Sequence, residues 1–124
     1  MSPDILVVDD DAGIRTLLSD MLQLEGYSVR LAADGLAALD ECGVALPDLM
    51  ILDLAMPRLD GFGVVRELVV RKWRERIPVF VLTARAGACE QLAASTPVEE
   101  CTLKPFDMDD VIEKVQRLLT TPTK

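Results

Sequence analysis

The stretch ILDLAMPRLDG, residues 51–61, begins as an apolar strand and ends as a turn. Ile51 and Leu52 are followed directly by Asp53, which puts a carboxylate at the tip of the strand. Burial disfavours an ionised carboxylate unless another charge or a hydrogen-bond donor compensates it. The groups that compensate Asp53 must therefore come from other parts of the fold.

Short apolar stretches alternate with amphipathic segments along the chain. The periodicity predicts strands over residues 4–8, 28–32, 49–52, 79–82 and 101–103, and helices over residues 12–24, 36–41, 61–73, 88–94 and 107–119. Gly26 is expected to end the first helix, and Pro97 favours a short or irregular fourth helix. Near-continuous apolar strands between helices predict an α/β fold, a doubly wound five-stranded parallel sheet with helices on both faces.

The length and composition restrict the classes of function. The 124 residues fit one domain over residues 1–120, with residues 121–124 as a tail or the start of a linker. The net charge of -8 argues against direct nucleic-acid binding by this domain, because phosphate backbones attract Lys and Arg. The chain has no histidine, which excludes histidine-based catalysis, and no apolar run reaches the ~18 residues of a membrane span.

The three cysteines are Cys42, Cys89 and Cys101. They are widely spaced, odd in number and form no CxxC pair, so we expect neither a disulfide nor a metal site. Reduced thiols suit a cytoplasmic protein.

Polar residues follow the predicted strands at one edge of the sheet. In open α/β sheets, ligands bind beyond the carboxyl ends of the strands, where the strand order reverses. If the order is 2-1-3-4-5, strands one and three are neighbours, and Asp9, Asp10 and Asp53 converge. Thr83 and Lys104 end the fourth and fifth strands at the same edge.

This set of groups is suited to phosphoryl transfer. Three close carboxylates need protons or a cation, and Mg²⁺ prefers such oxygen ligands. The Lys104 ammonium can hold an anion, and the Thr83 hydroxyl can donate a hydrogen bond. Because a carboxylate can act as a nucleophile towards phosphorus, Asp53 is the candidate phosphoryl acceptor.

Four ordered motifs carry a family resemblance: ILVVDDD (5–11), ILDLAMPRLDG (51–61), VLTA (81–84) and LKPF (103–106). They resemble the receiver domain of bacterial two-component response regulators of the chemotaxis-regulator kind. The resemblance implies a flavodoxin-like sheet of order 2-1-3-4-5. It also implies a phosphorelay signalling domain that is not an enzyme, although it assists its own phosphotransfer and dephosphorylation.

The resemblance assigns roles to the motif residues. Asp53 corresponds to the phosphorylated aspartate, and the Mg²⁺ ligands would be Asp9, Asp10, Asp53 and the backbone carbonyl of Ala55. Thr83 corresponds to the switch hydroxyl. Lys104 corresponds to the phosphate-holding lysine, with a cis peptide bond expected before Pro105.

The same resemblance implies partners. The phosphoryl donor would be a histidine kinase or a phosphotransfer protein in the cytoplasm, and no membrane contact is expected. The output would be a downstream protein target or a missing C-terminal output domain, and a phosphorylation-dependent homodimer through the last helix is a further expectation.

Two departures from the family pattern bear on signalling. Family members usually carry Tyr or Phe three residues before the lysine, where this chain has Cys101. The preceding segment reads STPVEEC (95–101) instead of the usual Gly-Ala-Asp type. Cys101 cannot fill an aromatic ring's volume, so coupling between Thr83 and an aromatic side chain is not expected.

Two other functions stay open at this stage. A phosphohydrolase of the haloacid dehalogenase type also uses Asp, Thr, Lys and Mg²⁺, but it needs a second acid at the position of Ala55. The second alternative function is that of a degenerate receiver, which acts by phosphorylation-independent binding. Some of the residues also have structural explanations, since Asp11 can cap the first helix and Asp60 with Gly61 can start the third.

Overall fold

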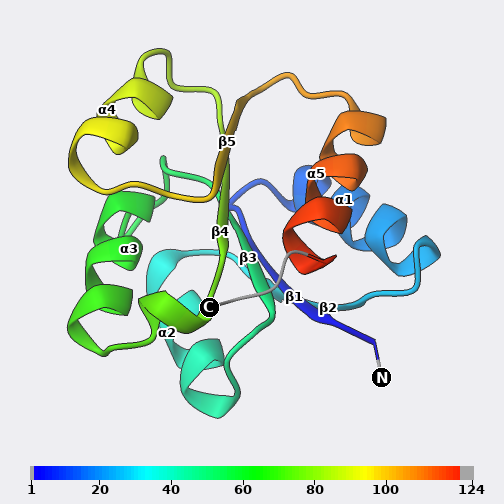
Figure 1. The fold of residues 1–124 in the computed structure, drawn as a ribbon, viewed down its shortest axis with the longest axis horizontal. Coiled ribbons are helices and arrows are strands. Elements are labelled where there is room, and N and C mark those ends of the chain that lie inside the picture. Colours follow the sequence, from blue (N-terminus) through cyan, green and yellow to red (C-terminus); the bar gives the residue numbers. More distant parts are fainter. Residues whose placement is uncertain (1, 121–124) are drawn as a thin grey trace.

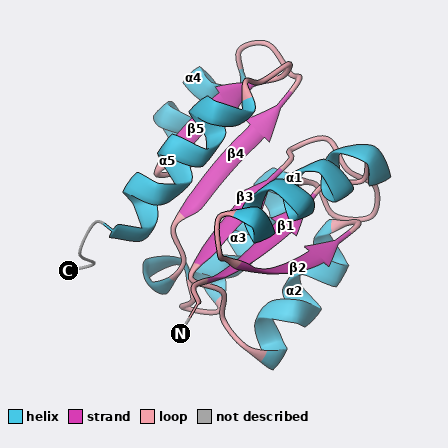
Figure 2. Ribbon diagram, turned by 90° about the vertical axis from the view of Figure 1, so that its right-hand side faces the viewer, coloured by secondary structure: helices cyan, strands magenta, loops and turns pink. Residues whose placement is uncertain are grey.

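The computed structural model describes residues 2–120 and contains a five-stranded parallel sheet of order β2-β1-β3-β4-β5. The strands are β1 (Asp4–Val8), β2 (Ser28–Ala32), β3 (Leu49–Leu52), β4 (Val79–Thr83) and β5 (Glu100–Leu103). The helices are α1 (Ala12–Leu24), α2 (Gly35–Val44), α3 (Gly61–Val70), α4 (Ala88–Ser95) and α5 (Met108–Thr120), with a 3-10 turn η1 (Arg74–Arg76). The predicted fold class and strand order are confirmed (Figure 2). The predicted tail, residues 121–124, lies outside the described residues.

The helices cover both faces of the sheet. α1 and α5 pack on one face, and α2, α3 and α4 pack on the other (Figure 1). Side chains alternate between the faces along each strand, so Ile5 and Val7 join the α1–α5 core, while Leu6 and Val8 join the opposite one. Because both faces are buried, the strands need continuous apolar runs, which is the pattern that predicted them.

The helix ends follow local capping chemistry. Gly26, at φ 95, ends α1 as predicted, and the N–H of the next residue, Tyr27, donates to the Leu22 carbonyl at 3.2 Å. The predicted second helix was too short, because α2 runs from Gly35 to Val44. The predicted third helix was too long, because α3 ends at Val70. Lys72 adopts the left-handed conformation, at φ 63, and ends that helix in the same way. None of the helices within residues 2–120 has the length and apolar character needed to cross a membrane.

Aspartates start four of the helices. Their carboxylates accept hydrogen bonds from backbone amides of the first turn: Asp11 from Gly13, Asp34 from Ala37, Asp60 from Gly63 and Asp107 from Asp109, at 2.8 to 2.9 Å. These four carboxylates therefore have a structural role.

The prediction that the cysteines form no disulfide was wrong. Cys89, in the first turn of α4, is bonded to Cys101 of β5, and their Cα atoms are 5.7 Å apart. The two residues are separated by 12 positions and form no recognised spacing motif. The pairing arises because the loop after α4 returns the chain to the sheet beside that helix. Cys42 is free and buried in the core.

Gly61 allows α3 to begin directly against the end of β3. A Cβ at this position would lie 2.6 Å from the Asp53 carbonyl oxygen and 2.8 Å from the Leu54 Cα. The Gly61 amide also donates to the Leu54 carbonyl at 3.0 Å. The start of α3 therefore fixes the backbone at Asp53.

We predict that Gly61→Ala lowers the free energy of unfolding by about 1–3 kcal/mol, because the methyl group meets backbone atoms that cannot move freely. Urea denaturation measures the loss. Gly43→Ala in α2 is the matched control, since a Cβ there meets nothing within 4 Å. It should raise stability by about 0.5–1 kcal/mol, through helix propensity. Equal effects of the two substitutions would contradict this account.

Candidate functional site

The strand ladder brings the predicted acidic residues together. The Asp9 amide donates to the Ala32 carbonyl at 3.1 Å, and the Asp53 amide donates to the Val8 carbonyl at 2.9 Å. Both residues therefore continue the hydrogen bonding of the sheet past its last residues, and both lie at the carboxyl edge. One ligand oxygen each from Asp9, Asp10 and Asp53 lies within 4.8 Å of the others.

The three carboxylates differ in exposure. Asp9 is 3% exposed and Asp53 is 6% exposed, whereas Asp10 is exposed at the rim. Oxygen donors this close together, with one of them open to solvent, form a suitable ligand set for a hard divalent cation. The geometry thus fits Mg²⁺, as predicted from the sequence.

Lys104 brings a positive charge to the same edge. Its Nζ is 2.7 Å from Asp9 Oδ2 and 3.6 Å from Asp53 Oδ2, so one ammonium lies between two buried carboxylates. The Lys104 amide donates to the Thr83 carbonyl at 2.8 Å, which ties the ends of β4 and β5 together. The peptide bond between Lys104 and Pro105 is cis, as expected.

The electrostatics of Asp53 are unfavourable for its charged form. Burial is the main cause that raises the pKa of the Asp53 carboxyl, and the negative charge of Asp9 raises it further. The Lys104 ammonium and the amides of Ala55 and Leu54 act in the opposite direction without cancelling the effect. A further positive charge at the site would therefore be bound favourably.

Two further hydrogen bonds hold Asp9 in place. The Asp11 amide donates to Asp9 Oδ1 at 2.9 Å, and Arg15 Nη1 donates to the Asp9 carbonyl at 2.7 Å. The sequence analysis did not identify Arg15. Arg15 lies in the first turn and a half of α1, four residues after Asp11, and that spacing is the sequence signal that could have identified it.

Thr83 is the last residue of β4, and Ala55 lies in the loop that follows β3. Thr83 is fully buried, and its Oγ1 accepts a hydrogen bond from the Arg85 amide at 3.2 Å. The Ala55 amide donates weakly to Asp53 Oδ1, at 3.5 Å, so the backbone of residue 55 lies beside the candidate acceptor. The role of the Ala55 carbonyl as a metal ligand stays a prediction.

An ion pair missed by the sequence analysis fixes the loop after Asp53. Arg58, at φ 68, pairs with the buried carboxylate of Asp34, which starts α2. Gly35 is needed at the same place, because a Cβ there would overlap the Leu59 carbonyl oxygen. No local pattern predicts this pair, since its members are 24 positions apart and meet only in the folded protein.

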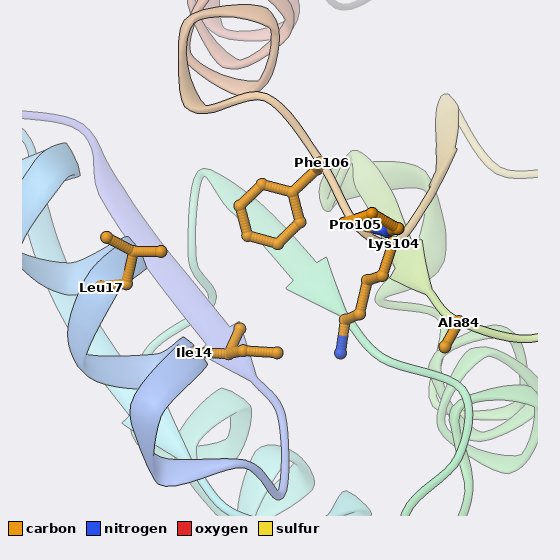
Figure 3. A pocket seen from close by; sticks show the side chains of 6 residues that line it. All are labelled: Ile14, Leu17, Ala84, Lys104, Pro105 and Phe106. Atoms are coloured by element: carbon orange, nitrogen blue, oxygen red, sulfur yellow. The ribbon is translucent and has the colours of Figure 1, made fainter.

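A groove of about 470 Å³ opens beside the acidic cluster. Figure 3 shows its lining residues, with the Phe106 ring facing α1 and the Lys104 side chain extending from the opposite wall. The lining comes from α1 and from the loops after β4 and β5: Ile14, Leu17, Ala84, Lys104, Pro105 and Phe106. Leu17 is 45% exposed, so an apolar surface borders the charged site.

The model of the response regulator receiver domain matches residues 5–116. The chain belongs to this family. Response regulator MprA of Mycobacterium bovis is 42% identical over 120 residues, covering 96% of this chain and 51% of MprA. This receiver thus spans about half the length of the curated relatives it matches.

Solved structures agree with the assignment. Response regulator TrrA from Thermotoga maritima, in complex with Mg²⁺-BeF, has a TM-score of 0.84 at 37% identity and covers 96% of this chain and 100% of its own. The receiver domain of a sensor histidine kinase from Pseudomonas aeruginosa, with a magnesium ion coordinated in the active site cleft, has a TM-score of 0.87 at 27% identity, covering 98% and 100%. The receiver-family assignment made from the motifs is therefore confirmed.

We predict that Asp53→Asn raises the thermal unfolding midpoint by a few degrees at pH 7 in metal-free buffer. The pKa of Asp53 is raised in the folded state, so its ionisation destabilises the fold as pH rises above the ordinary value of about 3.8. Calorimetry at several pH values measures the difference, which should shrink as pH falls and Asp53 becomes protonated.

Added Mg²⁺ should reverse the order of the two proteins, because the wild type, with its full set of carboxylates, gains more from cation binding than the Asp53→Asn variant does. A midpoint for Asp53→Asn below the wild type in metal-free buffer at pH 7 would contradict the electrostatic account.

Proposed function

We propose that this receiver accepts a phosphoryl group on the Asp53 carboxylate in the cytoplasm, with Mg²⁺ held by Asp9, Asp10, Asp53 and the Ala55 carbonyl. One observation carries the proposal: three carboxylates with oxygens within 4.8 Å of one another share an edge with the ammonium of Lys104. The Mg²⁺ complexes named for two structural relatives support the choice of metal.

The chemistry assigned to the side chains is a phosphoryl transfer from a phosphohistidine. An Asp53 oxygen attacks phosphorus, the new P–O bond forms, and the P–N bond of the donor breaks with its electron pair going to the imidazole nitrogen. Lys104 neutralises charge on the transferred group, and the Thr83 hydroxyl donates a hydrogen bond to it. Bound Mg²⁺ would supply additional charge neutralisation at the phosphoryl oxygens.

The donor is proposed to be a histidine kinase or a phosphotransfer protein that docks over the groove. The groove presents apolar side chains of α1 next to the charged site, so a partner helix placed there would bring its phosphohistidine close to Asp53. Residues on α1 would then select the partner.

The output is proposed to act through protein contact. The matched relatives are about twice as long as this chain, which supports a C-terminal output domain or a separate protein target as the receiver of the signal. The net charge of -8 supports contact with protein instead of nucleic acid. A phosphorylation-dependent homodimer through α5 is proposed as an alternative output state.

The domain is a signalling module, and we propose that its only catalysis is on its own phosphorylation and dephosphorylation. The match to the receiver-domain family over residues 5–116 argues against a phosphohydrolase of the haloacid dehalogenase type. Ala55 also lacks the second carboxylate which that hydrolase chemistry needs. A degenerate receiver remains an outcome that the following experiment can reveal.

We predict that acetyl phosphate with Mg²⁺ adds one phosphoryl group to the protein, measured as an increase in intact mass. The addition should fall at least about a hundredfold without Mg²⁺, because loss of the charge neutralisation raises the barrier by roughly 3 kcal/mol. Asp53→Asn should abolish it. Asp60→Asn is the matched control, since Asn also caps a helix and this residue lies outside the cluster.

A phosphoryl adduct that survives Asp53→Asn would refute the assignment of the acceptor. If no adduct forms, binding of beryllofluoride with Mg²⁺ separates rapid hydrolysis from a degenerate site. Beryllofluoride binding supports a short-lived adduct, and its absence means that the receiver acts without phosphorylation.

A further inference from the structure

The Cys89–Cys101 disulfide joins the two elements that flank the segment after Thr83. Cys89 lies in the first turn of α4, and Cys101 lies in β5, where it pairs with Val81 of β4. Figure 1 shows α4 beside the end of the sheet that carries β5. The bond therefore ties the start of α4 to the strand that leads into Lys104.

The rest of the packing holds α4 weakly. The helix has eight residues, and Ala88 and Leu92 are the two that it buries. Gly87 precedes it without a side-chain capping hydrogen bond, and residues 84–87 are exposed. Because so little apolar area fixes α4, the covalent bond to β5 contributes a large share of its restraint.

The same segment holds the Thr83 hydroxyl. Thr83 Oγ1 accepts a hydrogen bond from the Arg85 amide at 3.2 Å, so a hydroxyl that turns towards a phosphoryl group on Asp53 disturbs residues 84–87. Those residues end at α4, whose first turn the disulfide anchors. Cleavage of the disulfide frees the far end of this segment.

We propose that Cys89 and Cys101 form a reversible redox site that gates the phosphorylation response. In the oxidised form the disulfide restrains α4 and the loop after Thr83, and the domain responds poorly. In the reduced form the segment can move, and the domain accepts the phosphoryl group more readily. This inference rests on the proposed function of Asp53 and adds a second, redox input to it.

The reactant assigned to this site is a low-molecular-weight disulfide. One cysteine thiolate attacks a sulfur of that disulfide, forms a mixed disulfide and releases one thiol. The second cysteine then attacks the protein sulfur of the mixed disulfide and releases the second thiol. Two electrons pass from the two cysteines to the reactant, and the two protons end on the released thiols. A dithiol reverses the reaction.

Exposure distinguishes this pair from the third cysteine. Cys89 and Cys101 are both partly exposed, whereas Cys42 of α2 is 2% exposed. Burial raises the pKa of the Cys42 thiol and keeps it in its unreactive protonated form. Disulfides in reducing compartments are usually redox-sensing or catalytic, which fits a reversible bond in a cytoplasmic receiver.

The test compares oxidised and reduced wild-type protein. Glutathione disulfide prepares one form and dithiothreitol the other, and alkylation under denaturing conditions followed by mass spectrometry counts free thiols. Of the three cysteines, one should react in the oxidised protein and all three in the reduced protein. Calorimetric titration with beryllofluoride in Mg²⁺ buffer then measures affinity, which should be at least about fivefold tighter in the reduced form.

Three variants serve as controls. Cys89→Ser and Cys101→Ser should each bind beryllofluoride like the reduced wild type, with or without glutathione disulfide. Cys42→Ser should retain the wild-type difference, because it leaves the pair intact. The comparison of the two wild-type forms needs no variant, so poor folding of a variant leaves the test valid.

Equal affinities in the two redox forms, tighter binding by the oxidised form, or three free thiols after oxidation would each overturn the proposal. If beryllofluoride binds neither form and acetyl phosphate modifies neither, the proposed function of Asp53 fails and the redox gate fails with it. If Asp53 is phosphorylated at the same rate in both forms, only the redox gate is refuted.

Discussion

Two buried carboxylates and one ammonium meet at the carboxyl edge of the sheet, and much of the surrounding structure holds them there. Asp9 and Asp53 extend the ladders of adjacent parallel strands, while Lys104 extends the last strand. The Lys104 Nζ is closer to Asp9 than to Asp53, and burial together with the negative charge of Asp9 keeps the pKa of the Asp53 carboxyl above its ordinary value. Because the negative charges of the carboxylates at this site are incompletely balanced, a cation binds there favourably.

The loop after β3 is fixed by close backbone packing and by an ion pair to a buried carboxylate. Gly61 brings α3 against the Asp53 carbonyl, and Arg58 reaches back to Asp34 at the start of α2. The loop after β4 has less support, because residues 84–87 are exposed and α4 buries little. Asp53 is thus held firmly, while the segment that carries the Thr83 contact has room to change, restrained by the disulfide.

The acidic composition divides into structural and chemical parts. Asp11, Asp34, Asp60 and Asp107 satisfy amides at helix starts, and Asp9, Asp10 and Asp53 form the candidate metal site. A count of charges cannot separate these groups, because both use the same side chain at the ends of the same strands. Burial and the hydrogen-bond partner distinguish them.

The sequence by itself determined the strand and helix pattern, the family and the residues that gather at the sheet edge, because these depend on local periodicity and on motifs at strand ends. Its errors were the lengths of α2 and α3 and the state of the cysteines. The Arg58–Asp34 pair and the Cys89–Cys101 bond were decided by tertiary structure alone. Each requires the packing of segments whose relative positions no local pattern specifies, and a covalent or ionic contact forms only once the fold has brought its partners within reach.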